Sequence, residues 1–287
     1  MANNQPALQP LSKVIFADGA FVPVLGQGTW HMGESARRAS REAAALRYGI
    51  DLGMTLIDTA EMYGDGGAEE VVGQAIIGRR DEVFIVSKVY PHNAGAKNAI
   101  AACNRSLARL RTDRLDLYLL HWRGRVPLAE TIDAFERLRH GGKIIRWGVS
   151  NFDVDDMDEL AKLPDGARCA SNQVLYNLAE RGVEWALLPR CRERGITVMA
   201  YSPVGQGALV RNKKLANLAA SIDATPVQLA LAWLASQPNV IVIPQSSDVR
   251  HLDENRAAAN ITFTPMLLDA IDAAFSPPGR ATALSIL

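Results

Sequence analysis

The sequence predicts an α/β fold, a single (β/α)₈ barrel in which an N-terminal β-hairpin closes the bottom. Two observations predict it. Apolar strand-like runs alternate with amphipathic helical stretches, and eight such strand–helix units follow one another along the 287 residues. Alternating units of this kind form a parallel sheet. Eight of them in a chain near the usual length of about 250 residues favour a closed TIM barrel, with residues 1–287 as one domain.

The expected hairpin covers residues 13–25 and has Asp18 and Gly19 at its turn. The Pro-rich tail, 276–287, is expected to pack over the barrel. The predicted strands are 23–30, 55–58, 83–88, 115–121, 143–150, 169–174, 197–202 and 240–244. The predicted helices are 34–52, 67–78, 97–110, 127–141, 154–163, 183–194, 226–237 and 249–259. The helix 127–141 has proline near its start and glycine at its end, which is the usual asymmetry of helix termini.

The main alternative fold is an open Rossmann-like sheet. That fold carries the motif G-x-G-x-x-G after its first strand. Here Gly26 and Gly28 are followed by His31 at the position of the third glycine. The motif is therefore absent, and the barrel remains the predicted fold.

Composition excludes several classes of function. Lysine plus arginine and aspartate plus glutamate both number 31, so no long-range attraction to nucleic acid or to an anionic membrane is expected. The segment "MANNQPALQPL" lacks the features of a secretory signal, and no apolar run is long enough for a membrane span. Three widely spaced cysteines favour buried thiols in the cytoplasm, and the five histidines show no metal-binding spacing. We expect a cytoplasmic, monomeric protein without a catalytic metal.

Four ionisable residues lie at or just after the ends of predicted strands. Asp58, Lys88 and His121 each close a strand, and Tyr63 lies in the turn after the first of these strands. In a barrel these ends meet at the face that carries the active site. A lysine beside a tyrosine lowers the pKa of the phenol, and Asp58 would keep Lys88 charged. His121 could orient a carbonyl group so that Tyr63 donates a proton to its oxygen.

Each of these residues also has an ordinary structural interpretation. A lysine at a strand end is often at the surface, an aspartate before Thr-Ala can cap a turn, and a histidine before tryptophan is often a core residue. Their occurrence together on three consecutive strands favours the catalytic interpretation.

Seven motifs resemble those of the aldo-keto reductase superfamily, in order and across nearly the whole chain. They are "LIDTAEMYG", "VSKVYP", "LDLYLLHW", "RWGVSNF", "NQVLYNL", "MAYSPVGQG" and "IPQSS" followed by "EN". The segments "GQGTWHMGE" and "DTAEMYGDGGAEEVVG" resemble the prokaryotic branch that reduces small aldehydes such as methylglyoxal. The resemblance implies reduction of aldehydes or ketones by NADPH. It also implies Asp58, Tyr63, Lys88 and His121 as a catalytic tetrad, with Tyr63 as general acid.

The resemblance also implies a coenzyme site on the same face of the barrel. Ser150, Asn151 and Gln173 would hold the nicotinamide carboxamide, and Tyr201 would stack under the nicotinamide ring. Without the resemblance, Asn151 could be a turn residue and Tyr201 a core aromatic. The expected coenzyme contacts are Gly28, Thr29, Trp30, Asp58, Ser150, Asn151, Gln173, Tyr201, Ser202, Val204, Gln206, Ser246, Arg250, Glu254 and Asn255.

The sequence departs from the common family pattern at the adenosine end of this site. Gln245 stands where lysine is usual, and His251 stands where arginine is usual. Asp248 adds a negative charge nearby, although Ser246 and Arg250 could compensate. We therefore expect NADPH to bind with a weaker preference over NADH than is usual in the family, so that NADH is a possible coenzyme.

Aromatic residues are expected to line the substrate pocket. The predicted lining is Trp30, Tyr63, Tyr90, His121, Trp122 and Phe152. Trp30 and Trp122 could instead belong to the core. Such walls suit small carbonyl compounds, and the short tail suggests an open pocket with broad specificity.

Two other functions remain open at this point. One is a barrel lyase or aldolase in which Lys88 forms a Schiff base, which requires a lysine that is often neutral. The other is a non-catalytic, coenzyme-sensing subunit of a larger assembly. The sequence does not identify the physiological substrate, the direction of the reaction in the cell or the oligomeric state.

Overall fold

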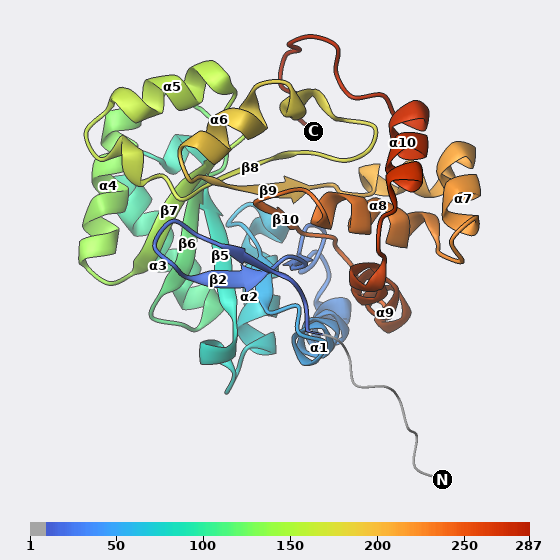
Figure 1. Ribbon diagram of the computed structural model, residues 1–287. Helices are drawn as coiled ribbons and strands as arrows, with labels where there is room; N and C mark the ends of the chain where they lie inside the picture. The colour runs from blue at the N-terminus through green and yellow to red at the C-terminus, as the bar shows by residue number, and fades with distance from the viewer. Residues whose placement is uncertain (1–9) are drawn as a thin grey trace.

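The computed structural model describes residues 10–287; the first nine residues, which make up most of the segment examined for a secretory signal, lie outside the described residues. Eight parallel strands form one sheet in the order β10-β9-β8-β7-β6-β5-β4-β3 (Figure 1). They are β3 (Gln27–Gly28), β4 (Leu56–Asp58), β5 (Phe84–Val89), β6 (Leu115–Leu120), β7 (Ile144–Ser150), β8 (Ser171–Leu175), β9 (Thr197–Tyr201) and β10 (Val240–Val242).

Hydrogen bonds between the two edges close this sheet into a barrel. The backbone N–H groups of Gly26 and Gly28 donate to the carbonyl oxygens of Val242 and Pro244, at 2.8 and 2.9 Å. In return, the N–H of Val242 donates to the carbonyl oxygen of Val24 at 2.8 Å. A closed ring leaves no unpaired strand edge. The predicted (β/α)₈ barrel is confirmed.

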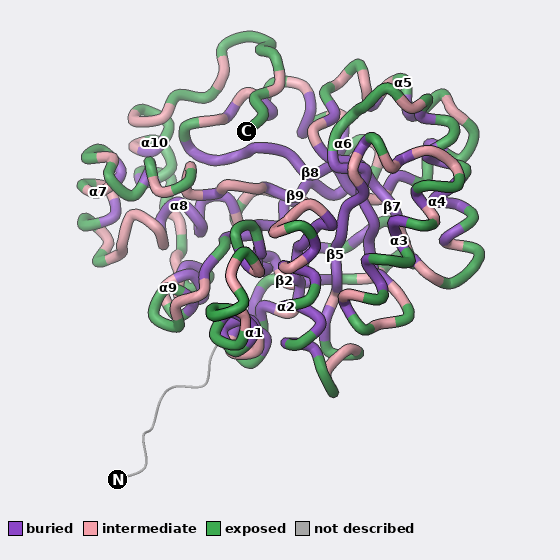
Figure 2. The backbone as a smooth tube through the Cα atoms, turned by 180° about the vertical axis from the view of Figure 1, so that it is seen from behind, coloured by how far each residue is buried: buried purple, intermediate pink, exposed green. Residues whose placement is uncertain are grey.

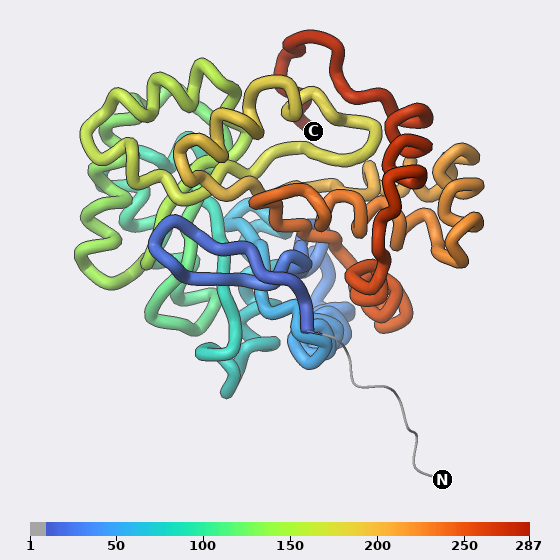
Figure 3. Tube along the Cα trace, viewed as in Figure 1, coloured from blue at the N-terminus to red at the C-terminus, as the bar shows by residue number. Residues whose placement is uncertain are grey.

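The hairpin consists of β1 (Lys13–Ile15) and β2 (Phe21–Pro23), which pair antiparallel. Phe16 stacks on Phe84 at the start of β5, with ring centroids 5.4 Å apart. The guanidinium of Arg146, near the start of β7, lies over the Phe16 ring and forms an ion pair with Asp18 at 2.6 Å. Figure 3 shows the hairpin in blue, crossing in front of the barrel strands. It covers the N-terminal strand ends, as predicted, and leaves the C-terminal ends free.

Helices surround the barrel, and all eight predicted helices are present with ends shifted by a few residues. They are α1 (Ala36–Asp51), α2 (Gly67–Ala75), α3 (Ala96–Leu110), α4 (Leu128–His140), α5 (Val154–Lys162), α6 (Leu187–Glu193), α8 (Pro226–Ala235) and α9 (Val249–Ala257). Two further helices, α7 (Lys213–Ala220) and α10 (Pro265–Ala274), were not predicted. Each begins at a capping side chain, Asn212 for α7 and Thr264 for α10, so a local signal was present.

The core consists of the strands and of the helix faces that pack on them. Every residue of β6 and of β8 is buried, because side chains on one face fill the barrel and those on the other contact helices. Figure 2 shows this arrangement, with buried strands enclosed by exposed and intermediate helices and loops. The three cysteines, Cys103, Cys169 and Cys191, are buried free thiols, and burial raises the pKa of each to about 12.

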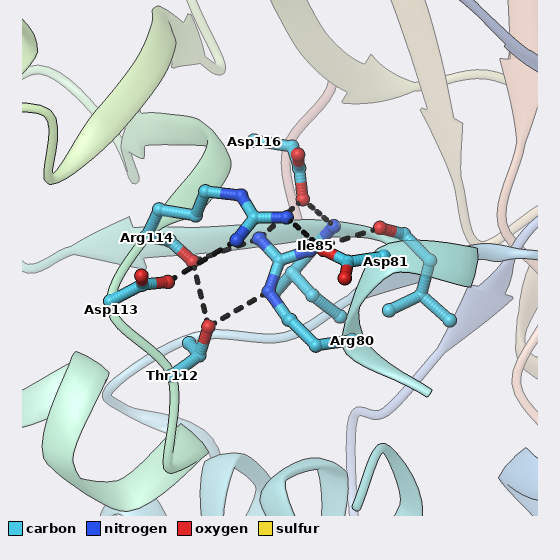
Figure 4. A network of polar contacts seen from close by, with 8 residues as sticks. Arg80, Asp81, Ile85, Thr112, Asp113, Arg114 and Asp116 are labelled. Carbon is cyan, nitrogen blue, oxygen red and sulfur yellow. Dashed lines mark hydrogen bonds and ion pairs between the residues drawn. The ribbon is translucent and has the colours of Figure 1, made fainter. Parts of the chain in front are cut away.

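A polar network joins the segments that lead into β5 and β6 (Figure 4). Arg80 forms an ion pair with Asp116 at 2.8 Å, and the same carboxylate accepts the backbone N–H of Ile85. Arg80 also donates to the hydroxyl of Thr112 and to the carbonyl oxygen of Arg114. Because these residues lie at or before the N-terminal halves of their strands, the network stabilises the end of the barrel opposite the C-terminal face.

Candidate active site

The strand ends bring the four predicted ionisable residues together. Asp58 is the last residue of β4, Lys88 lies next to the last residue of β5, and His121 directly follows β6. Tyr63 begins the short 3₁₀ turn Tyr63–Gly66 that follows β4. Parallel pairing of β4, β5 and β6 fixes these positions side by side, and the N–H of His121 extends the ladder by donating to Val89.

Lys88 is the centre of this cluster and has no solvent exposure. Its Nζ atom lies 2.8 Å from Asp58 Oδ2, 2.8 Å from the carbonyl oxygen of Thr59 and 3.2 Å from the hydroxyl of Tyr63. These three contacts use all three donors of the ammonium group. The ring of His121 meets the ring of Tyr63 edge-on, with centroids 5.7 Å apart. The spatial arrangement expected from the sequence is present.

Burial and charge act in opposite directions on these groups. Burial, the largest single influence, opposes the charged form of Lys88, but the interactions with Asp58 and Tyr63 together outweigh it, so the pKa of Lys88 is raised. For Tyr63, burial raises the pKa, and the opposing effect of Lys88 does not cancel it. The expectation that Lys88 would lower the pKa of Tyr63 below its usual value is therefore wrong. At neutral pH Tyr63 carries its proton, which is the form that a proton donor requires.

His121 is held in its neutral form. Burial, reinforced by the nearby charge of Lys88, lowers the pKa of His121 to about 2. The buried Nδ1 atom has no hydrogen-bond partner among the described residues, and the backbone carbonyl accepts from Asn151 at 3.2 Å. A neutral imidazole still carries one N–H, which can donate to a carbonyl oxygen without adding charge to the site.

The low pKa of His121 predicts a loss of stability in mild acid. The folded state keeps the imidazole neutral, whereas the unfolded chain takes up a proton below its ordinary pKa of about 6.5. Between about pH 7.5 and about pH 5, this difference lowers the free energy of unfolding by about 2 kcal/mol. In His121→Asn that contribution is absent. Urea unfolding of both proteins at the two pH values measures it, and equal losses in both proteins would contradict the burial of a neutral imidazole.

The residues expected to hold the nicotinamide carboxamide lie next to this cluster. Ser150 and Asn151 come at the end of β7, and Gln173 is in β8. The hydroxyl of Tyr201, at the end of β9, donates to Asn151 Oδ1 at 2.9 Å. Gln173 Nε2 donates to Asp58 Oδ1 at 2.7 Å. This link between the amide and the carboxylate was not predicted, because it joins residues 115 positions apart without any local pattern.

A cavity of about 1060 Å³ opens above these residues. Its lining includes fourteen of the predicted site residues: Gly28, Thr29, Trp30, Asp58, Tyr63, His121, Trp122, Ser150, Asn151, Gln173, Tyr201, Ser202, Val204 and Gln206. It also includes Gln245, which was expected at the adenosine end of the site, together with Pro203 and Gly207. The remaining lining residues were not assigned to the site: His31, Met62, Arg123, Asp156, Ile243, Ile286 and Leu287. Lys88 lies beneath the surface, within contact distance of Tyr63.

Two of the predicted substrate-pocket residues do not line the cavity. Phe152 is completely buried in the core, so its assignment to the pocket wall is wrong. The preceding Asn151 has a left-handed backbone with φ of 59°, and the chain turns there before Phe152. Tyr90 packs edge-on against Trp122, with centroids 5.8 Å apart, and supports the wall from behind. The tail does reach the cavity, where the N–H of Leu287 lies 3.4 Å from the Tyr201 hydroxyl.

A second cavity, of about 330 Å³, lies where α9 begins beside α1, and it is lined by Arg41, Ala44, Ala45, Ser247, Asp248, Val249 and Arg250. Asp248 Oδ2 lies 3.7 Å from Arg41 and 3.4 Å from Arg250. The same carboxylate caps α9 by accepting the N–H of Arg250. Contact with Arg250 lowers the pKa of Asp248, so this carboxylate is charged at neutral pH. Arg41 was not predicted as part of this region.

Three other residues expected at the adenosine end lie close by but outside the lining of both cavities. Ser246 accepts the backbone N–H of Asp248 at 3.1 Å, and Glu254 and Asn255 are in α9. Asn255 is buried. Within residues 10–287, no group of three or more histidine, cysteine, aspartate or glutamate side chains is arranged to hold a metal ion.

The sequence of the chain is similar to those of known enzymes. The sequence profile that describes the aldo/keto reductase family matches residues 24–275. The chain is 50% identical over 277 residues to methylglyoxal reductase YeaE of Escherichia coli, covering 95% of this chain and 98% of that protein. It is 34% identical over 259 residues to glyoxal reductase of Bacillus subtilis, covering 89% and 90%.

A solved structure agrees closely with the fold. The aldo-keto reductase of Klebsiella pneumoniae, crystallised in complex with NADPH, superposes with a TM-score of 0.94 at 49% identity. The match covers 96% of this chain and 100% of that chain. Together with the family profile and the curated relatives, this similarity shows that the chain belongs to the aldo/keto reductase family.

Proposed function

We propose that this aldo-keto reductase converts small aldehydes and ketones of the methylglyoxal type to alcohols, with Tyr63 as the general acid. The observation that carries the proposal is the position of the Tyr63 hydroxyl, 3.2 Å from the buried ammonium of Lys88 at the floor of a large cavity. The similarity to methylglyoxal and glyoxal reductases supports the substrate class.

The lining of the cavity fits a nicotinamide coenzyme. Ser150, Asn151 and Gln173 present a hydroxyl and two amides at one place, and such uncharged groups suit a neutral carboxamide. Tyr201 offers an aromatic ring beside them, anchored through Asn151. When bound there, NADPH would supply the hydride that reduces the carbonyl carbon. A structural neighbour with nearly half its residues identical was crystallised with NADPH, which supports this coenzyme.

Residues of the chain then donate the proton and stabilise the negative charge that develops. The carbonyl oxygen of the substrate accepts a hydrogen bond from the neutral His121 imidazole, which places it beside the Tyr63 hydroxyl. Tyr63 donates its proton to this oxygen as negative charge develops there. The phenolate that remains is stabilised by Lys88, whose ammonium is held in place by Asp58 and Thr59. The raised pKa of Lys88 keeps that positive charge present throughout the neutral pH range.

The same pairing weighs against a Schiff-base lyase. Such an enzyme needs a neutral lysine amine as nucleophile. Lys88 is buried, charged and bound to a carboxylate, and all of its donors are in use. Borohydride trapping of a carbonyl compound on Lys88 would support the lyase, whereas coenzyme oxidation supports the reductase.

A panel of carbonyl compounds with both coenzymes tests the proposed function. We expect methylglyoxal to accelerate the oxidation of NADPH, followed at the absorbance band of the reduced nicotinamide. Failure of every aldehyde and ketone in the panel to do so would contradict the proposed function.

The same panel tests the preference between coenzymes. The ratio of kcat/KM for NADPH over NADH should stay below about 10³, which corresponds to about 4 kcal/mol. The reason is that the Asp248 carboxylate pairs with Arg41 and Arg250, which would otherwise attract a phosphate. Asp248→Asn should raise the ratio by a few-fold, because it removes an exposed negative charge beside Arg41 and Arg250 whose effect is screened by salt. A wild-type ratio above about 10³ would contradict this interpretation of the loop.

Two further proposals concern the surroundings of the protein. We propose a monomeric, cytoplasmic enzyme that binds the coenzyme and a small carbonyl compound and has no nucleic-acid or membrane partner. The balance of 31 basic and 31 acidic residues supports the absence of a nucleic-acid or membrane-surface partner. Among the described residues, none of the helices combines the length and apolar character needed to cross a membrane.

A further inference from the structure

Three charged side chains form a cluster at the rim of the large cavity. Arg123 follows Trp122 in the loop after β6, and both residues line the cavity together with Asp156 of α5. The Nη1 atom of Arg123 lies 2.7 Å from Asp156 and 2.7 Å from Glu159, and Nη2 lies 2.8 Å from the second oxygen of Glu159. We call Arg123, Asp156 and Glu159 the rim triad.

The rim triad is fixed by its surroundings. Glu159 engages both terminal nitrogens of the guanidinium, which is the two-point geometry that makes arginine–carboxylate pairs specific. Asp156 also belongs to the capping box of α5, where its second oxygen accepts the N–H of Asp153. The start of α5 therefore holds Asp156 in place, and Asp156 helps to hold the arginine. The hydrogen bonds that Arg123 donates to Glu159 and Asp156 raise the pKa of Arg123, so its charge is permanent.

The rim triad contains Arg123, which is the one arginine or lysine among the described residues that line the cavity. A free arginine at this place would bind the carboxylate of an anionic substrate in two-point fashion. Here two carboxylates of the chain already occupy the guanidinium, and the three groups together carry a formal charge of about −1.

We propose that the rim triad selects substrates by charge: it admits uncharged carbonyl compounds and disfavours aldehydes or ketones that carry a carboxylate. The inference rests on the proposed function and specifies its substrate class. Asp156 and Glu159 repel an anion that approaches the mouth, and they also occupy Arg123, the one arginine or lysine among the described lining residues that could bind the anion. A neutral dicarbonyl such as methylglyoxal meets neither obstacle.

A matched pair of substrates tests the proposal. Succinic semialdehyde carries a carboxylate, whereas its methyl ester presents the same aldehyde without charge. The quantity measured is the ratio of kcat/KM for the acid over that for the ester. In Glu159→Gln the triad becomes neutral, and we expect this ratio to rise at least about fivefold, with little change for the ester. Glu159 does not itself line the cavity, so its isosteric replacement leaves the wall in place.

Two more variants and a control define the effect. Glu159→Gln combined with Asp156→Asn leaves a net positive charge and should raise the ratio further, whereas Arg123→Gln should lower it below the wild-type value. Asp133→Asn is the control, because it removes one exposed carboxylate, paired with Arg137 on α4, that does not line the cavity. Its ratio should remain within about twofold of wild type. An unchanged ratio in both Glu159→Gln and the double variant would overturn the proposal.

A second measurement needs no turnover. Of the five tryptophans, Trp147 and Trp233 are buried, and Trp30 and Trp122 line the cavity. With Trp185→Phe as background, quenching of fluorescence therefore reports on the cavity mouth. Iodide is an anion and acrylamide is neutral, so the ratio of their quenching constants should rise at least about twofold in Glu159→Gln.

The quenching ratio tests charge selection by the rim triad independently of the proposed reductase function. If the wild type reduces neither aldehyde, the proposed function fails while the quenching ratio still decides the role of the triad. If the ester is reduced and neither the kinetic ratio nor the quenching ratio changes, the triad proposal alone fails.

Discussion

Replacing Tyr63 with phenylalanine is expected to lower kcat by about 10²- to 10⁴-fold, the usual contribution of a positioned general acid. The substitution removes only the hydroxyl that lies 3.2 Å from Lys88 and leaves the ring that packs edge-on against His121. Coenzyme affinity should be nearly unchanged, because the carboxamide contacts assigned to Ser150, Asn151 and Gln173 remain. Steady-state rates with methylglyoxal and titration of NADPH fluorescence measure the two quantities.

A matched control removes a tyrosine hydroxyl elsewhere. Tyr48→Phe on α1 deletes a hydroxyl that donates to Asp253 and that does not line the cavity. Its kcat should remain within about twofold of wild type, which is below the effect of any general acid. Retention of more than about a tenth of the wild-type kcat in Tyr63→Phe would show that another group supplies the proton.

Replacing Lys88 with methionine is expected to destabilise the fold as well as abolish turnover. Lys88 has no solvent exposure and Asp58 has 3%, so the substitution leaves a buried carboxylate without its counter-charge. Breaking a buried ion pair in this way costs about 3–5 kcal/mol of unfolding free energy. Urea denaturation at pH 7 measures the loss, and the phenolate of Tyr63 would also lose the cation that stabilises it.

The double variant Asp58→Asn with Lys88→Met distinguishes the two effects. It removes both charges, so most of the lost stability should return while turnover stays absent. A Lys88→Met protein as stable as wild type would show that water or a side chain movement neutralises Asp58. Recovery of activity in the double variant would contradict the catalytic role of the pair.

The positions of the four clustered residues could be predicted because they depend on a short-range pattern. Asp58, Lys88 and His121 each terminate or follow an apolar strand, and parallel strands of a barrel bring these ends to one face. The same reasoning placed the hairpin, since Asp18 and Gly19 interrupt two apolar arms. Local chemistry and alternating elements were sufficient for these features.

Other features depend on contacts between distant segments and could not be predicted in the same way. The hydrogen bond from Gln173 to Asp58 and the ion pairs of Arg123 with α5 join residues with no common local pattern. The pKa of Tyr63 depends on how deeply the ring is buried, and a sequence does not give that depth. Phe152 was misplaced because a single left-handed residue, Asn151, precedes it.

The hairpin at the N-terminal end of the strands has a practical consequence. Its turn at Asp18 and Gly19 is exposed, and it lies at the end of the barrel opposite the mouth of the large cavity. A cysteine introduced at Gly19, where an added side chain would meet no atom within 4 Å, would allow tethering to an electrode or bead. The positive φ of Gly19 makes the exchange somewhat strained, but an immobilised enzyme attached there would face the solution with its entrance unobstructed.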